Sequence, residues 1–439
     1  MKNKITILLL FSVFALSAQQ KKWTLKECVD YALEHNISIQ QSELDIETAE
    51  INKNDAKGSF LPNLNANIRH SWNTGLNTNP VTNTNVTATT QNTNFGISSS
   101  IVLYDGLRNV NQLHKSNLLL LANQYQLEDM KDNISLRIAN AYLQILFNRE
   151  SLKSLRIQTS LNEKEYERTK ELVKEGVIPK GDVLEIEATI AKQEQDIVAM
   201  QNSLILSKLS LFNILSLNNF EEFDIDTQEI TLEENAIVLE SPTSIFQKAI
   251  EFRNDIKISE VQIKLAENDL KIAKGNYLPT LTGSFGFSTN YFQSKLLNLP
   301  NFSNQIDKNK GHAFGLGLSI PIFNRFQIRN AVKRSKIAIK SSQLNLEQSK
   351  INLRDKVYQA YNDLQGALKT YQANEKTLIA RKEAFAYSEE KFRVGLLNSF
   401  TYNQIKTRLE NAEISLIRAK YDYLFKLKVL EYYFGIPLH

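Results

Sequence analysis

The stretch Ala-Lys-Gly-Ser-Phe-Leu-Pro-Asn-Leu at residues 56–64 returns as Ala-Lys-Gly-Asn-Tyr-Leu-Pro-Thr-Leu at residues 273–281. Six of the nine positions are identical, and the two copies lie 273 − 56 = 217 residues apart. Further on, Gly176 and Gly395 lie in matching segments at a separation of 395 − 176 = 219 residues. A period of this size is too long for a solenoid repeat, so the sequence predicts a chain of two similar halves.

Each half is predicted to contain the same elements in the same order. Two helices precede the repeated stretch, two strands follow it, and a long helical hairpin ends the half. An acidic segment without helical periodicity links the halves. The predicted bounds are: first repeat 19–217, with strands 62–74 and 94–105 and hairpin 107–217; linker 218–242; second repeat 243–439, with strands 279–292 and 312–323 and hairpin 326–433.

The helical hairpins are unusually long. Residues 107–175 contain neither Gly nor Pro, and at 1.5 Å per residue they can form a helix of roughly 100 Å. The matching residues 326–394 contain a single glycine, Gly366. Helices of this length need packing partners along their whole extent, and the spacing of Ile134 and Ile138 indicates an apolar face. A soluble coiled-coil rod has the same helical pattern, so the helices alone leave that alternative open.

The predicted strands alternate between apolar and small or polar residues. Phe314, Leu316 and Leu318 alternate with Gly315 and Gly317. Membrane β-barrel strands of about ten residues have this pattern, with apolar side chains facing lipid. An ordinary half-buried sheet in a periplasmic domain shows the same alternation, and the strands alone do not separate the two. The small residues that fit a lumen are Ser284, Gly286, Gly315, Gly317 and Ser319.

The residues around the strands favour the membrane interpretation. The connections over 73–94 and 298–311 are polar and are predicted to be extracellular loops. Two histidines in the strand regions, His70 and His312, are interpreted as lumenal or interfacial polar residues rather than ligands. Aromatic residues near the strand ends suggest interfacial girdles; they are Trp72, Tyr104, Tyr291, Phe292 and Phe323.

The N-terminus indicates export. Lys2 and Lys4 precede an apolar run, and Ser17-Ala18 offers a cleavage site, so residues 1–18 are predicted to be a secretory signal peptide. A retained anchor is the competing interpretation, but about 14 apolar residues are short of the roughly 20 that span a bilayer. No later continuous run reaches that length, so no transmembrane helix is expected. The single cysteine, Cys28, excludes an intramolecular disulfide and is interpreted as a small packed residue.

Composition and motifs argue against several function classes. The 52 basic and 48 acidic residues are interspersed, and the net charge of +4 gives no case for nucleic-acid binding. The five histidines lack metal-ligand spacing, and no phosphate-binding Gly loop occurs. We therefore expect no cofactor, no metal site and no enzyme activity, since a periplasmic hydrolase would need a catalytic constellation.

Four strands per chain cannot close a barrel, because the smallest membrane barrels have about eight. An open sheet edge is not tolerated in hydrocarbon, so the chain is predicted to oligomerise. Two copies would give a barrel of about eight strands, which side chains fill. Three copies would leave room for a conduit.

The order and duplication of these features resemble the TolC-like outer-membrane efflux family over the entire mature chain. The features that carry the resemblance are the duplicated entry stretch, the Leu-Tyr-Asp-Gly exit at residues 103–106, and the turn Val-Gly-Leu-Leu-Asn-Ser at residues 394–399. The resemblance implies a mainly α-helical homotrimer with a membrane β-barrel portion. Each protomer would add four strands to a twelve-stranded barrel in outer-membrane lipid, continued by a long α-helical barrel in the periplasm.

The same resemblance implies the partners. The channel would be the passive exit duct of a tripartite efflux pump or a type I secretion system. It would dock a periplasmic membrane-fusion adaptor and an inner-membrane pump of the RND or ABC type. The residues implied to contact the adaptor at the hairpin tips are Gly176, Val177, Ile178, Val394, Gly395, Leu396, Leu397 and Ser399.

The periplasmic entrance departs from the family pattern. Members often carry acidic residues on the second tip helix, where this chain has Thr401 and Gln404. The first half has Asp182 at the equivalent point and Glu185 one turn later. These four residues are expected to line the entrance. For Asp182, capping of the helix that starts there is an equally weighted alternative.

Overall fold

The computed structural model describes residues 22–78, 81–227 and 240–436, so the expected signal peptide lies outside the described residues. The chain divides into two compact units. The helical unit comprises the described parts of residues 1–43, 126–256 and 348–439. The strand unit comprises those of residues 44–125 and 257–347.

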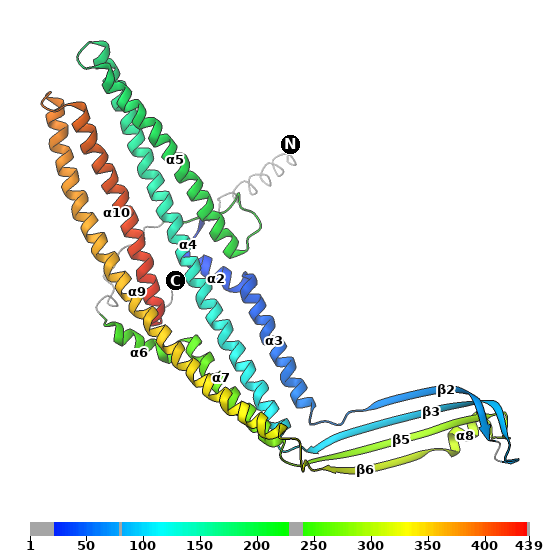
Figure 1. The fold of residues 1–439 in the computed structure, drawn as a ribbon. Coiled ribbons are helices and arrows are strands. Elements are labelled where there is room, and N and C mark those ends of the chain that lie inside the picture. The colour runs from blue at the N-terminus through cyan, green and yellow to red at the C-terminus, as the bar shows by residue number, and fades with distance from the viewer. Residues whose placement is uncertain (1–21, 79–80, 228–239, 437–439) are drawn as a thin grey trace, which may run out of the picture. The chain divides into compact units, whose positions relative to one another are not determined.

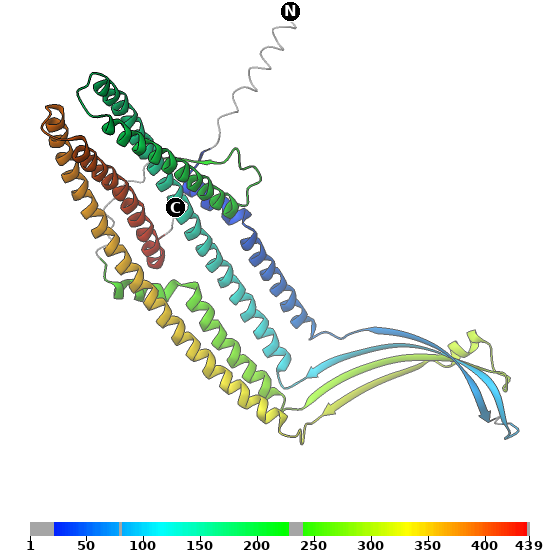
Figure 2. The ribbon, with the colours of Figure 1, turned by 45° about the horizontal axis from the view of Figure 1, so that its top comes forward.

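The helices of the two halves match in length, pair by pair. The pairs are α2 (Leu25–His35) and α6 (Pro242–Phe252), 11 residues each; α3 (Ile37–Gly58) and α7 (Asn254–Gly275), 22 each; α4 (Arg108–Lys174) and α9 (Gln327–Arg393), 67 each; and α5 (Lys180–Leu215) and α10 (Ser399–Phe434), 36 each. Each helix of the first half therefore has a counterpart of identical length in the second half. In the helical unit α5 runs back along α4, and α10 runs back along α9 (Figure 1; Figure 2).

Polar caps define several helix starts. Thr24 caps α2 by accepting a hydrogen bond from the Glu27 amide at 3.2 Å, while the Glu27 carboxylate accepts one from the Thr24 amide at 2.9 Å. This reciprocal pair satisfies two amides that lack helical partners. Asn398 caps α10 through the Thr401 amide at 2.8 Å. The buried face of α4 includes Ile134 and Ile138, as their spacing predicted.

One helix differs from the sequence expectation. Within the part of the chain that the structure describes, α5 is long and apolar enough to cross a membrane by length and composition. The sequence predicted no transmembrane helix, because no continuous apolar run after the N-terminal one is long enough to span a bilayer. The mean hydropathy of its most apolar window still reaches 1.3, and only 17% of that window is buried within the chain. Much of this apolar surface, including Val198, Ile205 and Leu206, is exposed.

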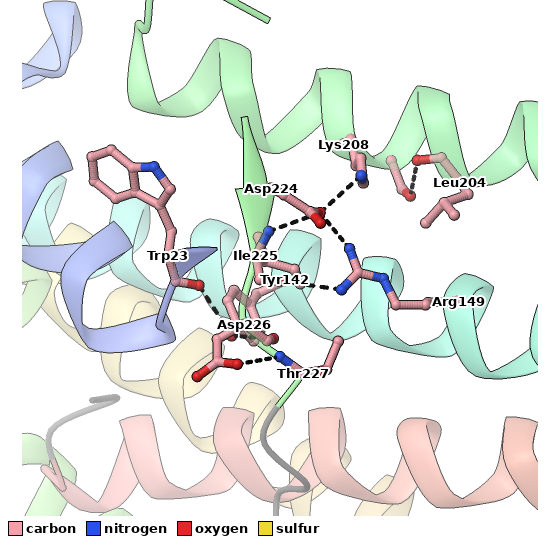
Figure 3. Close-up of polar contacts among 10 residues, drawn as sticks. Trp23, Tyr142, Arg149, Leu204, Lys208, Asp224, Ile225, Asp226 and Thr227 are labelled. Carbon is pink, nitrogen blue, oxygen red and sulfur yellow. Dashed lines mark hydrogen bonds and ion pairs between the residues drawn. The ribbon is translucent and has the colours of Figure 1, made fainter. Parts of the chain in front are cut away.

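The residues predicted to form the linker, or equatorial segment, include a short strand. β4 (Asp224–Ile225) pairs in parallel with β1 (Lys22–Trp23) near the start of the described chain. Arg149 on α4 forms an ion pair with Asp224, and Lys208 on α5 approaches the same carboxylate at 2.8 Å (Figure 3). Burial opposes ionisation of Asp224, but the two cations outweigh it and lower its pKa. These contacts fasten both β1 and the linker to the long hairpin.

The strand unit contains one antiparallel sheet in the order β2 (Asn65–Thr78), β3 (Asn85–Tyr104), β5 (Thr280–Ser294) and β6 (Gly311–Ser319). The four strands lie side by side in both views (Figure 1; Figure 2). β2 and β6 are its edges, and neither has a second strand partner among the described residues.

The two connections between strands and the end of β6 differ from the prediction. The expected loop over 73–94 is largely strand, because β2 and β3 stay paired from Asn65 with Ser98 to Thr78 with Asn85. The many threonines of this segment favour extended backbone. The prediction interpreted the segment as a loop because it is polar. The other loop contains α8 (Phe302–Lys308), a short helix that was not predicted. β6 ends at Ser319 rather than near residue 323. Pro321 follows and has no amide to donate to a ladder.

Candidate functional site

The strand register gives the sheet one apolar face. Residues directly opposite each other in an antiparallel pair project to the same side. Ile68 lies opposite Phe95, and Phe285 opposite Phe314. The same register places further apolar residues of all four strands on this face. In chain order its apolar residues include Ala66, Ile68, Trp72, Leu76, Phe95, Ile97, Ile101, Leu281, Phe285, Phe287, Phe314, Leu316 and Leu318. It presents a continuous surface suited to lipid.

The opposite face is polar and carries mostly small side chains. Asn67 lies opposite Gly96, and Ser284 opposite Gly315. A Cβ atom on Gly96 would lie 2.7 Å from the Asn67 Oδ1, and one on Gly315 would lie 2.8 Å from the Ser284 Oγ. The glycines therefore leave room for the polar side chain of the neighbouring strand. The register places the five small residues singled out in the sequence on this one face, as predicted.

The two strand histidines lie on the apolar face. Of the two positions that the sequence left open for them, the lumenal one is therefore wrong, and the interfacial one stays a prediction. The ring of His70 packs edge-on against Trp72 at a centroid distance of 4.0 Å, and its Nδ1 lies 2.6 Å from the Thr93 Oγ1. His312 lies 5.2 Å from the Phe287 ring. Side chains alternate between the two faces along a strand, so the face of a residue follows from its position and not from its polarity.

Each long hairpin reverses at a glycine with left-handed backbone geometry. Gly176 has a φ of +75° and Gly395 a φ of +76°. The next amide, of Val177 or Leu396, donates to a carbonyl of the preceding helix at 2.9 Å and 2.8 Å respectively. This hydrogen-bond pattern ends a helix and reverses the chain, and a residue with a Cβ would be strained at the glycine position.

The tips expose apolar side chains to solvent. Val177 is 66% exposed and Leu396 is 76% exposed, whereas Ile178 and Leu397 are half-buried. Val394 is exposed beside Gly395. Sequence reasoning missed one further residue of this surface. Phe400, in the first turn of α10, is 71% exposed. The only sign of it in the sequence was its position as an aromatic residue close to the polar helix cap.

The acidic residue of the first tip contacts the second tip. The Asp182 carboxylate accepts a hydrogen bond of 2.9 Å from the Ser399 hydroxyl. The N-cap of α5 is Pro179, and no side chain caps that end. Asp182 therefore does not cap α5 through a hydrogen bond, and that part of the capping alternative is wrong. Its carboxylate in the first turn still interacts favourably with the helix dipole.

The other three residues predicted at the entrance lie at the same helix starts. Glu185 and Gln404 are exposed, while Thr401 is half-buried. Only Asp182 joins the two hairpins among the four. An exposed carboxylate such as Glu185 leaves its charge available to ions in solution.

Further along the hairpins, a buried polar network joins α4, α5 and α10. Asn162 donates to the Gln193 Oε1 at 2.9 Å and accepts from the Lys406 ammonium group. Gln193 in turn donates to Glu410 at 3.4 Å. Asn162 is 5% exposed and Gln193 is 7% exposed. Sequence reasoning missed this network, because polar residues on a long helix are usually solvated.

Burial perturbs both charged members of the network. Desolvation lowers the pKa of Lys406, against the attraction of Glu410, Glu165 and Glu389. Desolvation likewise raises the pKa of Glu410, against the attraction of Lys406. Both shifts favour the neutral form, as expected for charges removed from water. Among the described residues, no group of three His, Cys, Asp or Glu side chains could hold a metal ion.

Comparison with known proteins shows the family of the chain. Residues 28–216 and 245–435 match the family described as "Outer membrane efflux protein". The chain is 22% identical over 305 residues to the outer membrane protein TolC of Vibrio cholerae, which spans 70% of this chain and 68% of that relative. It is also 22% identical over 439 residues to TolC of Escherichia coli, spanning 97% of this chain and 84% of the relative.

Solved structures share the fold. The Campylobacter jejuni CmeC outer membrane channel matches with a TM-score of 0.81 at 16% identity, covering 94% of this chain and 85% of that chain. The open state of the Neisseria gonorrhoeae MtrE outer membrane channel matches with a TM-score of 0.76 at 17% identity, covering 94% and 89%. Members of the matched family are channels rather than enzymes. The chain belongs to the outer membrane efflux protein family: it is an outer-membrane exit channel for efflux, with a β-barrel portion and a helical portion in the periplasm.

Proposed function

We propose that three copies of this chain close one twelve-stranded barrel and act as the exit duct of a tripartite export machine. The observation that carries the proposal is the pair of open sheet edges, β2 and β6. An open edge leaves backbone amides and carbonyls without partners, which hydrocarbon does not tolerate. Since successive strands run antiparallel, β6 of one copy has the correct direction to pair with β2 of the next.

Three copies suit the polar face better than two. A barrel of about eight strands is filled by its own side chains. The polar face of this sheet carries Gly, Ser, Thr and Asn, with glycines at Gly96, Gly315 and Gly317. Such small side chains would pack a narrow barrel poorly, but they suit the wall of a water-filled conduit. The exposed apolar surface of α5 likewise suits packing between copies.

We assign the docking of a periplasmic adaptor to the hairpin tips. The support is the exposed apolar surface around Val177 and Leu396, which lies at two turns that each reverse at a glycine with positive φ. Exposed apolar groups at a turn favour a protein partner. Asp182, Glu185, Thr401 and Gln404 would line the entrance, and an inner-membrane pump of the RND or ABC type would supply cargo. The channel itself conducts passively.

Two measurements test the assembly. Native mass spectrometry of the detergent-purified protein is expected to give trimers, and a stable folded monomer or dimer would contradict the proposal. Fractionation of cells into membrane and soluble parts tests the alternative of a periplasmic rod. Such a rod would be soluble without detergent. Recovery of the chain in the soluble periplasmic fraction would therefore count against a barrel.

A further inference from the structure

The four strands of the sheet contain one charged residue. Arg69 on β2 is the only Asp, Glu, Lys or Arg in β2, β3, β5 and β6. It is exposed, and it forms no ion pair with any residue that the structure describes. A guanidinium group remains protonated at any physiological pH. The sheet therefore carries one fixed positive charge per chain.

Register places Arg69 on the polar face. It lies opposite Asn94 on β3, between Asn67 and Ser71 on its own strand. Its neighbours in sequence, Ile68 and His70, belong to the apolar face. An arginine facing lipid is strongly unfavourable near the middle of a bilayer, so both the alternation and the charge direct Arg69 toward water.

Arg69 lies within the length of the sheet rather than at its rim. It is the fifth residue of β2, and nine more residues follow it before the strand ends at Thr78. At about 3.3 Å per residue, it lies roughly 13 Å from the start of the strand. On the other face of β2, Ile68 and Trp72 flank this level and are 72% and 66% exposed. The charge therefore lies level with the apolar band.

The surroundings of Arg69 suit a dissolved anion better than a protein counter-ion. Amide side chains that can donate hydrogen bonds lie nearby on the polar face, at Asn67 and Asn94. β2 is an edge strand, and the polar face of the opposite edge strand carries Ala313, Gly315 and Gly317, which project little. A long side chain at the joint between two copies would therefore meet no bulky neighbour on that face.

We propose that Arg69 forms an anion-binding ring inside the barrel, three guanidinium groups in the trimer, that attracts carboxylate- and phosphate-bearing solutes into the outlet. This inference rests on the proposed trimer. The planar guanidinium offers paired N–H donors that match carboxylate and phosphate oxygens. A ring of like charges in a narrow polar conduit raises the local concentration of counter-ions. The barrel would thus favour anions, independently of the acidic residues on the tip of α5.

The test uses the purified full-length channel in planar bilayers, with inorganic pyrophosphate as the probe. Pyrophosphate should reduce the current of the unchanged protein, and the effect should weaken as salt screens the charge. Arg69→Gln should raise the concentration needed for half block by about tenfold at low salt. Arg69→Lys keeps the charge and should retain most of the block. Gly75→Ser, which adds no charge on the same strand, is the matched control and should leave the block unchanged.

A second variant covers the case in which Arg69→Gln does not assemble. Asn67→Asp keeps Arg69 and places a carboxylate two residues away on the same face, so it should also raise the pyrophosphate concentration needed for half block. Trimeric, conducting Arg69→Gln or Asn67→Asp channels that pyrophosphate blocks as before would overturn the anion ring alone. Failure of the unchanged protein to form trimers or conducting channels would overturn the proposed function together with it.

Discussion

The hairpin α4/α5 and the hairpin α9/α10 have the same backbone plan and different surfaces. Their helices are equal in length, 67 and 36 residues, and both reverse at a glycine with positive φ. The first tip carries Asp182 and Glu185, whereas the second has Thr401 and Gln404 at the matching positions. Helix length and turn geometry must match for the hairpins to pack side by side, but exposed side chains can diverge. The two halves are therefore free to take different roles.

The same divergence extends into the interior. Lys406 and Glu410 enter the buried network from the second hairpin. Their equivalents in the first hairpin, 219 residues earlier, are Glu187 and Ala191, and both are exposed. The half-buried charges of this network thus come from the second hairpin only. This asymmetry links α10 to α4 and α5, while the equivalent positions of α5 face outward.

Removal of the apolar character of the second tip should have the largest effect. Leu396→Asp combined with Leu397→Asp is expected to abolish export, because charged residues cannot pack on an apolar partner surface. Trimers should remain in the membrane, as shown by native mass spectrometry of extracted protein. The matched change in the first tip, Val177→Asp with Ile178→Asp, tells whether both tips bind. Full export by the Leu396 and Leu397 variant would rule out this contact.

The acidic difference between the tips should set ion selectivity at the entrance. Asp182→Asn with Glu185→Gln removes up to six carboxylates from a trimer, so cation selectivity and block by multivalent cations should weaken. Thr401→Asp with Gln404→Glu should strengthen both by adding acids to the second tip. Reversal potentials in planar bilayers measure the change. Equal selectivity in all three proteins would mean that other residues line the entrance.

Disruption of the buried network should destabilise the helical unit. Asn162→Leu removes the acceptor of Lys406 and the donor to Gln193, leaving buried polar groups without partners. The expected loss is about 2–3 kcal/mol of unfolding free energy. Glu187→Leu, at the exposed equivalent of Lys406, is the control and should change stability by at most about 0.5 kcal/mol. Chemical unfolding followed by circular dichroism compares them. Equal midpoints would mean that the network is solvated.

The network should also make stability depend on pH in a defined direction. Burial raises the pKa of Glu410, so the folded state holds its proton over a range above pH 4.5 where the unfolded state has lost it. The contribution of Glu410 to stability is therefore present below that range and is lost as pH rises through it. Glu410→Gln should reduce the gain in Tm between pH 7 and pH 5. An unchanged pH dependence would assign that gain to Asp129 and Asp132, whose pKa values burial also raises.

The turn glycines should show the smallest effects, and the same effect in both hairpins. Gly176→Ala and Gly395→Ala should each cost about 1 kcal/mol, because alanine is strained at positive φ although no atom lies within 4 Å of the added Cβ. Gly366→Ala, within α9, should instead stabilise by roughly 0.5–1 kcal/mol. Unfolding midpoints of the three variants test the contrast. A loss at Gly366 would indicate that a partner copy packs there.

Sequence reasoning succeeded where local rules decide the structure. The duplicated stretch predicted the repeat of the helices, and the lack of Gly and Pro predicted the long hairpins. The alternation of apolar residues predicted the small residues on one strand face. It failed where pairing or burial decides. The threonine-rich residues after 73 form strand because β3 pairs with them, and His70 lies on the apolar face because of its register. The network around Asn162 was missed, because polar residues at ordinary helical positions give no sign of burial.

The sequence by itself thus determined the duplication, the lengths of the helices and the alternation of the strands, since each follows from backbone preference and residue spacing along the chain. Only the tertiary structure decided which charges are buried and which remain in water. It placed Lys406 and Glu410 between helices that are distant in sequence, joined Asp182 to Ser399, and left Arg69 as the one fixed charge on the polar face of the sheet. The cost of a charge depends on the atoms that surround it in space, and spacing along the chain does not specify those atoms.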